Sequence, residues 1–164
     1  MGKIDDALHQ AYTGESKASL RLKAYAEKAE EEGYPQMAKL FRVISVSEEI
    51  HGKRALRLLR ETKSTEENLA ASFESETKVA GVAYDVFIKM ANDEDNQAAA
   101  IYFSQSRDVE DVHAKLYKEA MGHMMEERET VYYVCKVCGY VSDGVLPDVC
   151  PVCGAPKEQF TEFK

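Results

Sequence analysis

Two pairs of acidic and imidazole side chains occur in this chain with the same spacing. Glu48 and His51 are three positions apart, and so are Glu110 and His113. Residues with this separation lie on the same face of an α-helix, so each pair can direct a carboxylate and an imidazole toward one point. Burying such groups without partners is costly. The spacing therefore predicts two metal ions bound between helices.

Four helices are expected to position these pairs, at about residues 4–32, 35–60, 64–91 and 97–126. Gly33 ends the first helix, and Pro35 suits the first turn of the second. Ser64 and Glu67 have the spacing of a capping box that opens the third. The polar segment 92–96 separates the third helix from the fourth.

The inner face of each helix carries metal-binding side chains at one level only. Alternating steps of three and four residues give stripes that are otherwise small or apolar, with Glu15 in the first helix and Glu76 in the third. A single glutamate on such a stripe usually reaches water, and a single Glu-x-x-His pair usually lies on the protein surface and binds no metal. Four coincident stripes instead match a carboxylate-bridged dimetal site in a four-helix bundle. Four carboxylates neutralise two divalent ions, and imidazole suits iron or manganese.

Four cysteines near the C-terminus form a second candidate metal site. They fall in two C-x-x-C pairs, and a glycine follows the second cysteine of each pair: Cys135, Cys138, Cys150 and Cys153. Four thiolates suit tetrahedral zinc or a single iron, and this spacing alone does not decide between them. A purely structural zinc ribbon is the alternative. The surrounding segment is too small to be held by apolar burial, so the metal should stabilise it.

Composition narrows the classes of partner. The 164 residues carry a net charge of −8, which argues against nucleic acid and anionic membranes as main partners. No apolar run long enough to span a bilayer and no apolar signal core are present, so we expect a cytoplasmic protein. We expect two domains, an all-α four-helix bundle over residues 1–129 and a small metal-stabilised β/loop domain over 130–164, which begins with a short strand at 130–134.

At these motifs the chain resembles the rubrerythrins, which join a ferritin-like di-iron bundle to a rubredoxin-like domain. The resemblance covers nearly the whole chain. It is carried by Gly14-Glu15-Ser16, Glu48-Glu49-Ile50-His51, Phe73-Glu74-Ser75-Glu76-Thr77, Glu110-Asp111-Val112-His113, and a tail C-x-x-C-G-Y followed by C-P-x-C-G-A-P-K-x-x-F that ends at Phe160. The tail is highly specific to rubredoxin-like domains and favours iron over zinc at the cysteines.

The resemblance implies a role for each predicted ligand. Glu15 and Glu76 would be terminal ligands of the two irons, Glu48 and Glu110 bridging carboxylates, and His51 and His113 the imidazole ligands. It also implies a peroxidase that reduces hydrogen peroxide to water, with electrons relayed by the tetrathiolate iron. A rubredoxin or an NAD(P)H-dependent reductase would be the upstream donor.

One departure from the family pattern opens an alternative function. Rubrerythrins usually carry a further glutamate one turn after the third-helix ligand, where this chain has Val79. An iron that exchanges ligands at that glutamate could not do so here, and His51 would stay bound in both redox states. The alternatives are therefore a ferroxidase or O2-reducing di-iron protein in iron handling and, in a different class, a zinc ribbon on a bundle used for protein contacts.

Helix length predicts an oligomer. From Glu110 to Glu126 the fourth helix extends about 24 Å at about 1.5 Å per residue. If the tetrathiolate site hangs from that far end, electron transfer within one chain is slow. We therefore expect a head-to-tail homodimer, in which the rubredoxin-like domain of one chain lies beside the di-iron site of the other.

Overall fold

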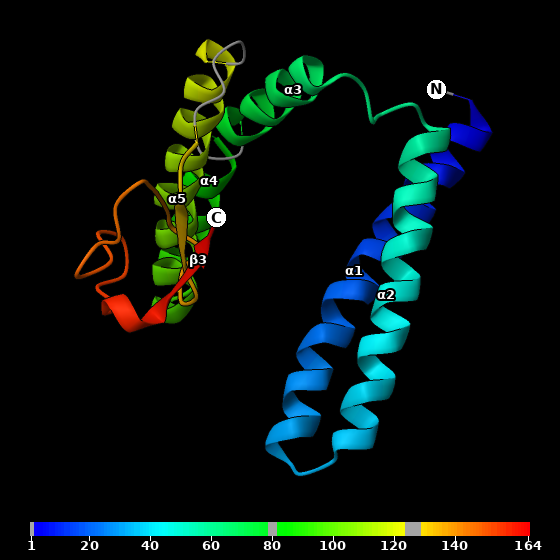
Figure 1. Ribbon diagram of the computed structural model, residues 1–164, viewed down its shortest axis with the longest axis horizontal. Coiled ribbons are helices and arrows are strands. Elements are labelled where there is room, and N and C mark those ends of the chain that lie inside the picture. Colours follow the sequence, from blue (N-terminus) through cyan, green and yellow to red (C-terminus); the bar gives the residue numbers. More distant parts are fainter. Residues whose placement is uncertain (1, 79–81, 124–128) are drawn as a thin grey trace. The chain divides into compact units, whose positions relative to one another are not determined.

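The described residues 2–78, 82–123 and 129–164 of the computed structural model are mostly helical and end in a region of short strands and loops (Figure 1). The chain divides into two compact units, residues 1–63 and 64–164. This division falls between the second and third helices, and the expected domain boundary at 129/130 stays a prediction. In the part of the chain that the structure describes, no helix is both long and apolar enough to cross a membrane.

The first unit is a hairpin of two antiparallel helices, α1 (Lys3–Glu31) and α2 (Pro35–Leu58) (Figure 1). Gly33 has a φ of 79° in the turn, a left-handed conformation that glycine adopts without steric cost. Pro35 occupies the start of α2, where its missing N–H leaves no bond unmade. Both turn residues therefore act as the sequence predicts.

Small residues form the contact between α1 and α2. Ser19 and Ser45 are buried and exchange hydrogen bonds: each hydroxyl donates to the backbone carbonyl of the other, at 3.1 and 3.0 Å. Ala26 and Ala38 are the most deeply buried residues of an adjoining cluster. Such short side chains let two helix axes approach closely. The contact face is therefore offset from the stripe that the sequence predicted, on which larger side chains are exposed: Tyr25, Met37 and Ile44.

Three helices begin the second unit: α3 (Thr65–Lys78), α4 (Tyr84–Asp93) and α5 (Gln97–Gly122). The capping box before α3 is confirmed, because Ser64 and Glu67 bond each other's backbone N–H through their side chains, both at 3.3 Å. The Asn96 side chain accepts from the N–H of Ala99 and caps α5. The predicted third helix corresponds to α3 and α4, with a π-helical turn at 82–83 directly before α4.

Aromatic rings join α4 to α5. The ring centroids of Phe87 and Phe103 are 5.4 Å apart, and Tyr84 lies 6.1 Å from Phe87 and 6.3 Å from Phe103. Rings at these separations gain more than their buried area alone provides. The cluster holds α4 along α5 near the level of the second-unit ligands.

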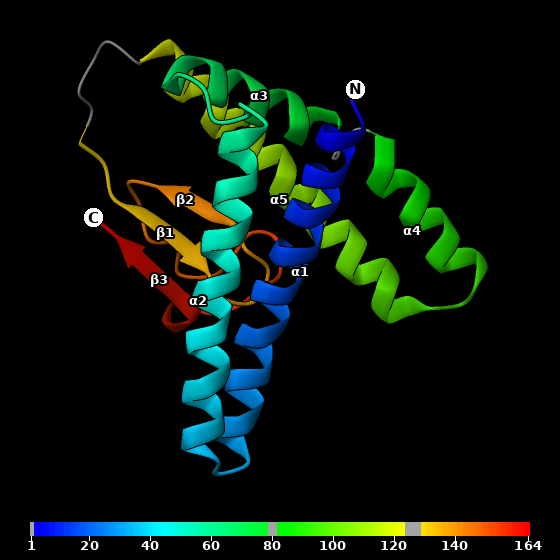
Figure 2. The same cartoon turned by 90° about the vertical axis from the view of Figure 1, so that its right-hand side faces the viewer.

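The C-terminal region contains a three-stranded antiparallel sheet in the order β2-β1-β3 (Figure 2). The strands are β1 (Tyr132–Cys135), β2 (Val141–Asp143) and β3 (Phe160–Phe163), the last preceded by a 3-10 turn, η2 (Lys157–Gln159). The predicted strand corresponds to β1. The core of this C-terminal region consists of buried Cys135, Cys150 and Ala155, packed against Tyr140 and Phe160. Four of the eight residues in the whole cluster are cysteines, so the stability of this region depends on what their sulfurs bind.

Replacing Ser45 by alanine should destabilise the first unit. The change removes the hydrogen bond that the Ser45 hydroxyl donates and leaves the buried Ser19 carbonyl without its side-chain donor. Loss of a buried partner costs about 1–3 kcal/mol. Urea unfolding followed by helical circular dichroism would measure this cost, and Ser47→Ala, an exposed serine on the same helix, is the matched control. Equal free energies of unfolding in the two variants would show that the serine pair does not stabilise the hairpin.

Candidate metal centres

The first unit brings together three of the predicted ligands. Glu15 comes from α1, and Glu48 and His51 come from α2; one ligand atom from each lies within 4.8 Å of the others. Nδ1 of His51 is 3.1 Å from Oε2 of Glu48 and 3.8 Å from Oε1 of Glu15. Ligand atoms at about 2.0–2.2 Å from a shared octahedral ion would be about 3 Å apart on neighbouring vertices. The triad is therefore close to the spacing that a metal ion requires.

The second unit contains a triad of the same composition. Glu76 comes from α3, Glu110 and His113 come from α5, and the three ligand atoms again lie within 4.8 Å of one another. Nδ1 of His113 is 3.0 Å from Oε2 of Glu110. Each unit thus positions two carboxylates and one imidazole, with one glutamate on one helix and a Glu-x-x-His pair on its neighbour.

The paired carboxylates raise each other's proton affinity. The pKa of Glu15 is raised because its side chain shares a hydrogen bond with Glu48 and because the two negative charges repel. The pKa of Glu76 is raised first by burial, then by its hydrogen bond with Glu110 and the charge of that group. Without a cation each pair therefore favours holding a proton, and a bound metal ion would replace that proton.

The ligand face is more open than the sequence predicted. The side chain of His51 is 51% exposed and that of His113 is 27% exposed, and the glutamates are partly exposed. Within the first unit taken by itself, α1 and α2 cover only each other's contact face, so the ligand face beside that contact is partly exposed. The ligands are thus brought together by two neighbouring helices within each unit.

Two acidic neighbours of the ligands are bound to lysines instead. Glu49 pairs with Lys53 and Lys23, and Glu74 pairs with Lys78; these contacts lower the pKa of both glutamates. Neither belongs to a triad. Both serve as controls for substitutions of the ligands beside them.

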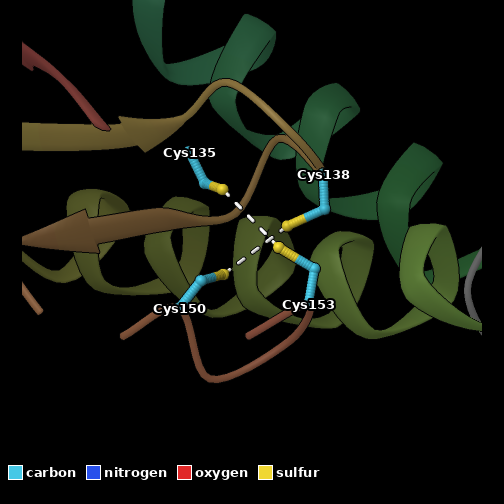
Figure 3. A group of neighbouring side chains, drawn as sticks. All are labelled: Cys135, Cys138, Cys150 and Cys153. Atoms are coloured by element: carbon cyan, nitrogen blue, oxygen red, sulfur yellow. Dashed lines mark hydrogen bonds between the residues drawn. The ribbon is translucent and has the colours of Figure 1, made fainter. Parts of the chain in front are cut away.

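The four cysteines gather around one point. Their sulfurs converge from two loops (Figure 3), with Cys135 and Cys153 3.7 Å apart and Cys138 and Cys150 3.6 Å apart. Thiolates at about 2.3 Å from a tetrahedral metal ion would lie about 3.8 Å from one another. All four are free thiols, so no disulfide competes with a metal. The donor set fits one iron or zinc ion.

The two cysteine loops have matching backbone structure. Gly139 and Gly154 have φ values of 83° and 74°, and the N–H of each donates to the carbonyl of the first cysteine of its loop, at 2.9 Å in both. These turns aim the N–H of Tyr140 at the sulfur of Cys138 and that of Ala155 at the sulfur of Cys153. Burial nevertheless raises the pKa of both thiols, which leaves a cation as the main source of thiolate stabilisation.

The positions of these ligands match a known family along most of the chain. A model described as "Rubrerythrin" matches residues 6–121, and one described as "Rubrerythrin, rubredoxin-like domain" matches residues 133–161. The chain belongs to the rubrerythrin family. The predicted fold class, a ferritin-like helical region followed by a rubredoxin-like strand-and-loop region, is confirmed. The family binds iron, and this rubrerythrin has the Glu/His groups and the four cysteines expected to hold it.

Individual relatives are similar in sequence to this chain over almost their full length. Rubrerythrin-2 of Clostridium acetobutylicum is 29% identical over 96% of this chain and 95% of its own. The rubrerythrin of Porphyromonas gingivalis is 30% identical over 99% of this chain and 90% of its own. A solved structure of nigerythrin in a mixed-valence state covers 99% of this chain and 88% of its own, with 29% identity and a TM-score of 0.61. Rubrerythrins are oxidoreductases, which supports an enzyme.

The structure also adds one group near the second triad. The Tyr84 hydroxyl hydrogen-bonds to Ser106, and the charges of Glu110 and Glu76 reach the phenol. Burial is the largest cause that raises the pKa of Tyr84, so the phenol keeps its proton. Ser106 lies one helical turn before Glu110 on α5 and gave no separate signal in the sequence. Val79, which departs from the family pattern, lies outside the described residues.

Replacing Glu76 by glutamine should change how the stability of the metal-free protein depends on pH. The pKa of Glu76 is raised above its ordinary 4.5, so the folded state binds more protons than the unfolded state between 4.5 and the raised value. Stability therefore falls as pH rises through this window. Glutamine does not ionise, so Glu76→Gln removes this fall in stability. The variant should be more stable than the unmodified protein at neutral pH, but not below about pH 4.5.

The control, Glu74→Gln, should have the opposite sign. Lys78 lowers the pKa of Glu74, so its contribution is present above the unfolded pKa and is lost as pH falls through the folded pKa. Thermal unfolding of chelator-treated protein between pH 4 and 8 would measure both variants. A Glu76→Gln protein no more stable than the unmodified one at pH 7 would contradict the shared-proton description.

Proposed function

We propose that this rubrerythrin is a non-haem di-iron peroxidase that reduces hydrogen peroxide to water, in defence against oxidative stress. The observation that carries the proposal is the duplicated triad: each unit gathers two carboxylates and one imidazole within 4.8 Å, and a third group gathers four thiolates. We propose that each triad supplies ligands to the irons of the di-iron centre and that the four thiolates hold a further iron.

Charge supports two cations at one centre. Four carboxylates, from Glu15, Glu48, Glu76 and Glu110, offset the charge of two divalent ions, so burying the whole group is far less costly than burying either part. Two neutral imidazoles then complete a ligand set that suits first-row metals. The irons would supply the electrons that cleave the O–O bond: peroxide takes up two electrons and two protons and yields two water molecules.

The side chains themselves position protons. Each triad pairs two carboxylates that tend to share a proton, and Tyr84 keeps a phenol proton within reach of the charges of Glu76 and Glu110. A hydrogen-bonded phenol beside the centre can orient an oxygen-containing substrate by donating to it. Tyr84 packs against Phe87 and Phe103, and these contacts hold the phenol beside α5.

Removing one ligand from either triad should abolish turnover while sparing the cysteine site. Glu48→Ala and Glu110→Ala each leave a triad with one carboxylate and one imidazole, which is too few donors to retain iron. Peroxide consumption would be measured with a chemical electron donor, and the visible absorption of ferric tetrathiolate would report that the cysteine site remains loaded. Glu49→Ala, whose carboxylate pairs with lysines, is the control and should keep full activity. Full activity in either ligand variant would refute the assignment.

The second candidate function, an O2-consuming ferroxidase in iron handling, is supported by Val79. This residue stands where rubrerythrins usually have an additional glutamate. Anaerobically reduced, iron-loaded protein would be mixed with peroxide or O2 in a stopped-flow spectrometer, because ferric tetrathiolate is coloured and ferrous is nearly colourless. Faster recolouring with peroxide supports the peroxidase, and faster recolouring with O2 supports the ferroxidase.

Introducing the missing carboxylate should alter this preference. Val79→Glu adds a further carboxylate three residues after Glu76 in the sequence and should raise the ratio of the peroxide rate to the O2 rate. Val79→Gln, which has similar size and no charge, is the control. An unchanged ratio in Val79→Glu would show that residue 79 does not set the choice of oxidant.

A further inference from the structure

The C-terminal region covers one side of α5 in the second unit. A Cβ placed on Gly139 would lie 3.9 Å from Cγ1 of Val109, which is ordinary van der Waals contact. Val109 is only 4% exposed, so the region shields this part of the helix from solvent. The prediction of a head-to-tail dimer assumed instead that the region lies beyond the far end of α5. That assumption is wrong, and the dimer itself stays a prediction.

A cavity of about 370 Å3 lies between the C-terminal sheet and helices α3 and α5. Tyr132 pairs with Asp143, which is two residues from Val141, so Tyr132 and Val141 project from the same face of the sheet. Seven residues line the cavity: Tyr132, Val141, Leu69, His113, Leu116, Tyr117 and Ala120. The four from α5 recur at steps of three or four and therefore share one side of that helix.

The cavity and the second triad share His113. Nδ1 of His113 lies 3.0 Å from Oε2 of Glu110, and a ligand atom of Glu76 lies within 4.8 Å of the ligand atoms of both. A molecule that fills the cavity therefore contacts a residue of the candidate metal centre. Tyr132 is exposed whereas Leu116 is half-buried, so within this unit solvent reaches the cavity on the side of Tyr132.

The size and lining of the cavity suit an uncharged organic group. Water occupies about 30 Å3 in the liquid, and hydrogen peroxide has only one more oxygen atom, so the cavity has room for several such molecules. Pockets that bind small organic molecules measure about 300–1,000 Å3 and are mostly apolar, with a few polar groups. Among the described residues that line this cavity, none is an acid, a lysine or an arginine. The net charge of −8 further disfavours an anionic ligand.

The cavity beside the first triad has a different chemistry. It measures about 250 Å3 and is lined in part by Glu48. Its wall also contains Lys23, Glu49 and Lys53, and both lysines pair with the glutamate. Covering these ions with an apolar group would remove them from water at a cost in free energy. Of the two cavities, the one at His113 therefore fits an apolar group better.

We propose that the cavity at His113 binds the organic substituent of an uncharged alkyl or aralkyl hydroperoxide, so that the protein reduces these hydroperoxides in addition to hydrogen peroxide. The inference rests on the proposed peroxidase function and adds a substrate class to the same centre. The substituent packs between Leu69, Leu116 and Val141, and the hydroperoxide group points toward His113.

The reaction needs no further reductant. A hydroperoxide ROOH takes up two electrons and two protons, its O–O bond breaks, and the products are the alcohol ROH and one water molecule. The electrons are the two that the proposed peroxidase supplies to hydrogen peroxide, and the protons come from solvent water. Of the chain's own residues, those that line the cavity contribute binding and orientation, because burying an apolar substituent holds the reactive end in place.

Binding can be tested without turnover. The full chain is loaded with zinc, which is diamagnetic and redox-inert, and is mixed with 2-phenyl-2-propanol, the alcohol formed from cumene hydroperoxide. Nuclear Overhauser effects are expected between the phenyl protons of the alcohol and the methyl groups of Leu69, Leu116 and Val141. No cross-peak at these methyls would overturn the proposal, and so would cross-peaks confined to exposed side chains such as Val43.

Filling the cavity tests its role in substrate choice. Ala120→Phe places a ring where the substituent would lie, and Ala98→Phe makes the same change at an exposed position of α5. Iron-loaded proteins would be compared by the ratio of kcat/KM for cumene hydroperoxide to kcat/KM for hydrogen peroxide. The ratio should fall about tenfold or more in Ala120→Phe, because the burial of the phenyl group is lost, and should be unchanged in Ala98→Phe.

The outcomes separate this inference from the proposed function. Equal ratios in the two variants would overturn the inference, and so would turnover of hydrogen peroxide without turnover of cumene hydroperoxide in the unmodified protein. Turnover of neither would refute the proposed function, and the zinc-loaded protein would still show whether the cavity binds an apolar group. Circular dichroism and ferric tetrathiolate absorption verify folding. If Ala120→Phe does not fold, Ala120→Leu against Ala98→Leu makes the same comparison with a smaller expected fall.

Discussion

Repulsion between paired carboxylates is the constraint on which the rest of this structure depends. Glu15 with Glu48, and Glu76 with Glu110, are held close enough to share hydrogen bonds, and in the absence of a cation each pair raises a pKa within it. A fold that keeps like charges together needs packing elsewhere to compensate. The unfavourable contact also defines what the protein should bind, because a cation turns the repulsion into attraction.

The compensating packing differs between the two units. In the hairpin it comes from small side chains: Ser19 and Ser45 exchange hydrogen bonds, and alanines let α1 approach α2 closely. In the second unit it comes from aromatic rings between α4 and α5 and from the C-terminal region against α5. In both units the ligands lie on a face beside the contact and remain partly exposed. One set of residues therefore packs the helices together, and a different set forms the candidate metal site.

The groups of side chains that depend on local spacing could be predicted from the sequence, and their roles as metal ligands stay predictions. The two Glu-x-x-His pairs and the two C-x-x-C turns need only one helix or one loop to converge, and the structure shows each of them converged. Glu15 and Glu76 required the correct helical phase, which the stripes provided. The Ser19–Ser45 contact and the burial of Val109 were not predicted, because each depends on which face of a helix meets a distant segment. A valine on a helix has the same local pattern whether a neighbouring strand, loop or solvent covers it.

The matching turns of the two cysteine loops have a consequence for how the protein acquires its metal. Their backbone hydrogen bonds and left-handed glycines are formed by the polypeptide alone, and they set the sulfurs at a separation that zinc and iron accept almost equally well. A site with this spacing has little selectivity between iron and zinc. The identity of the ion would then be decided by the relative abundance of the two metals while the chain folds, and preparations made under iron limitation would contain a colourless, redox-inert fraction of otherwise native protein.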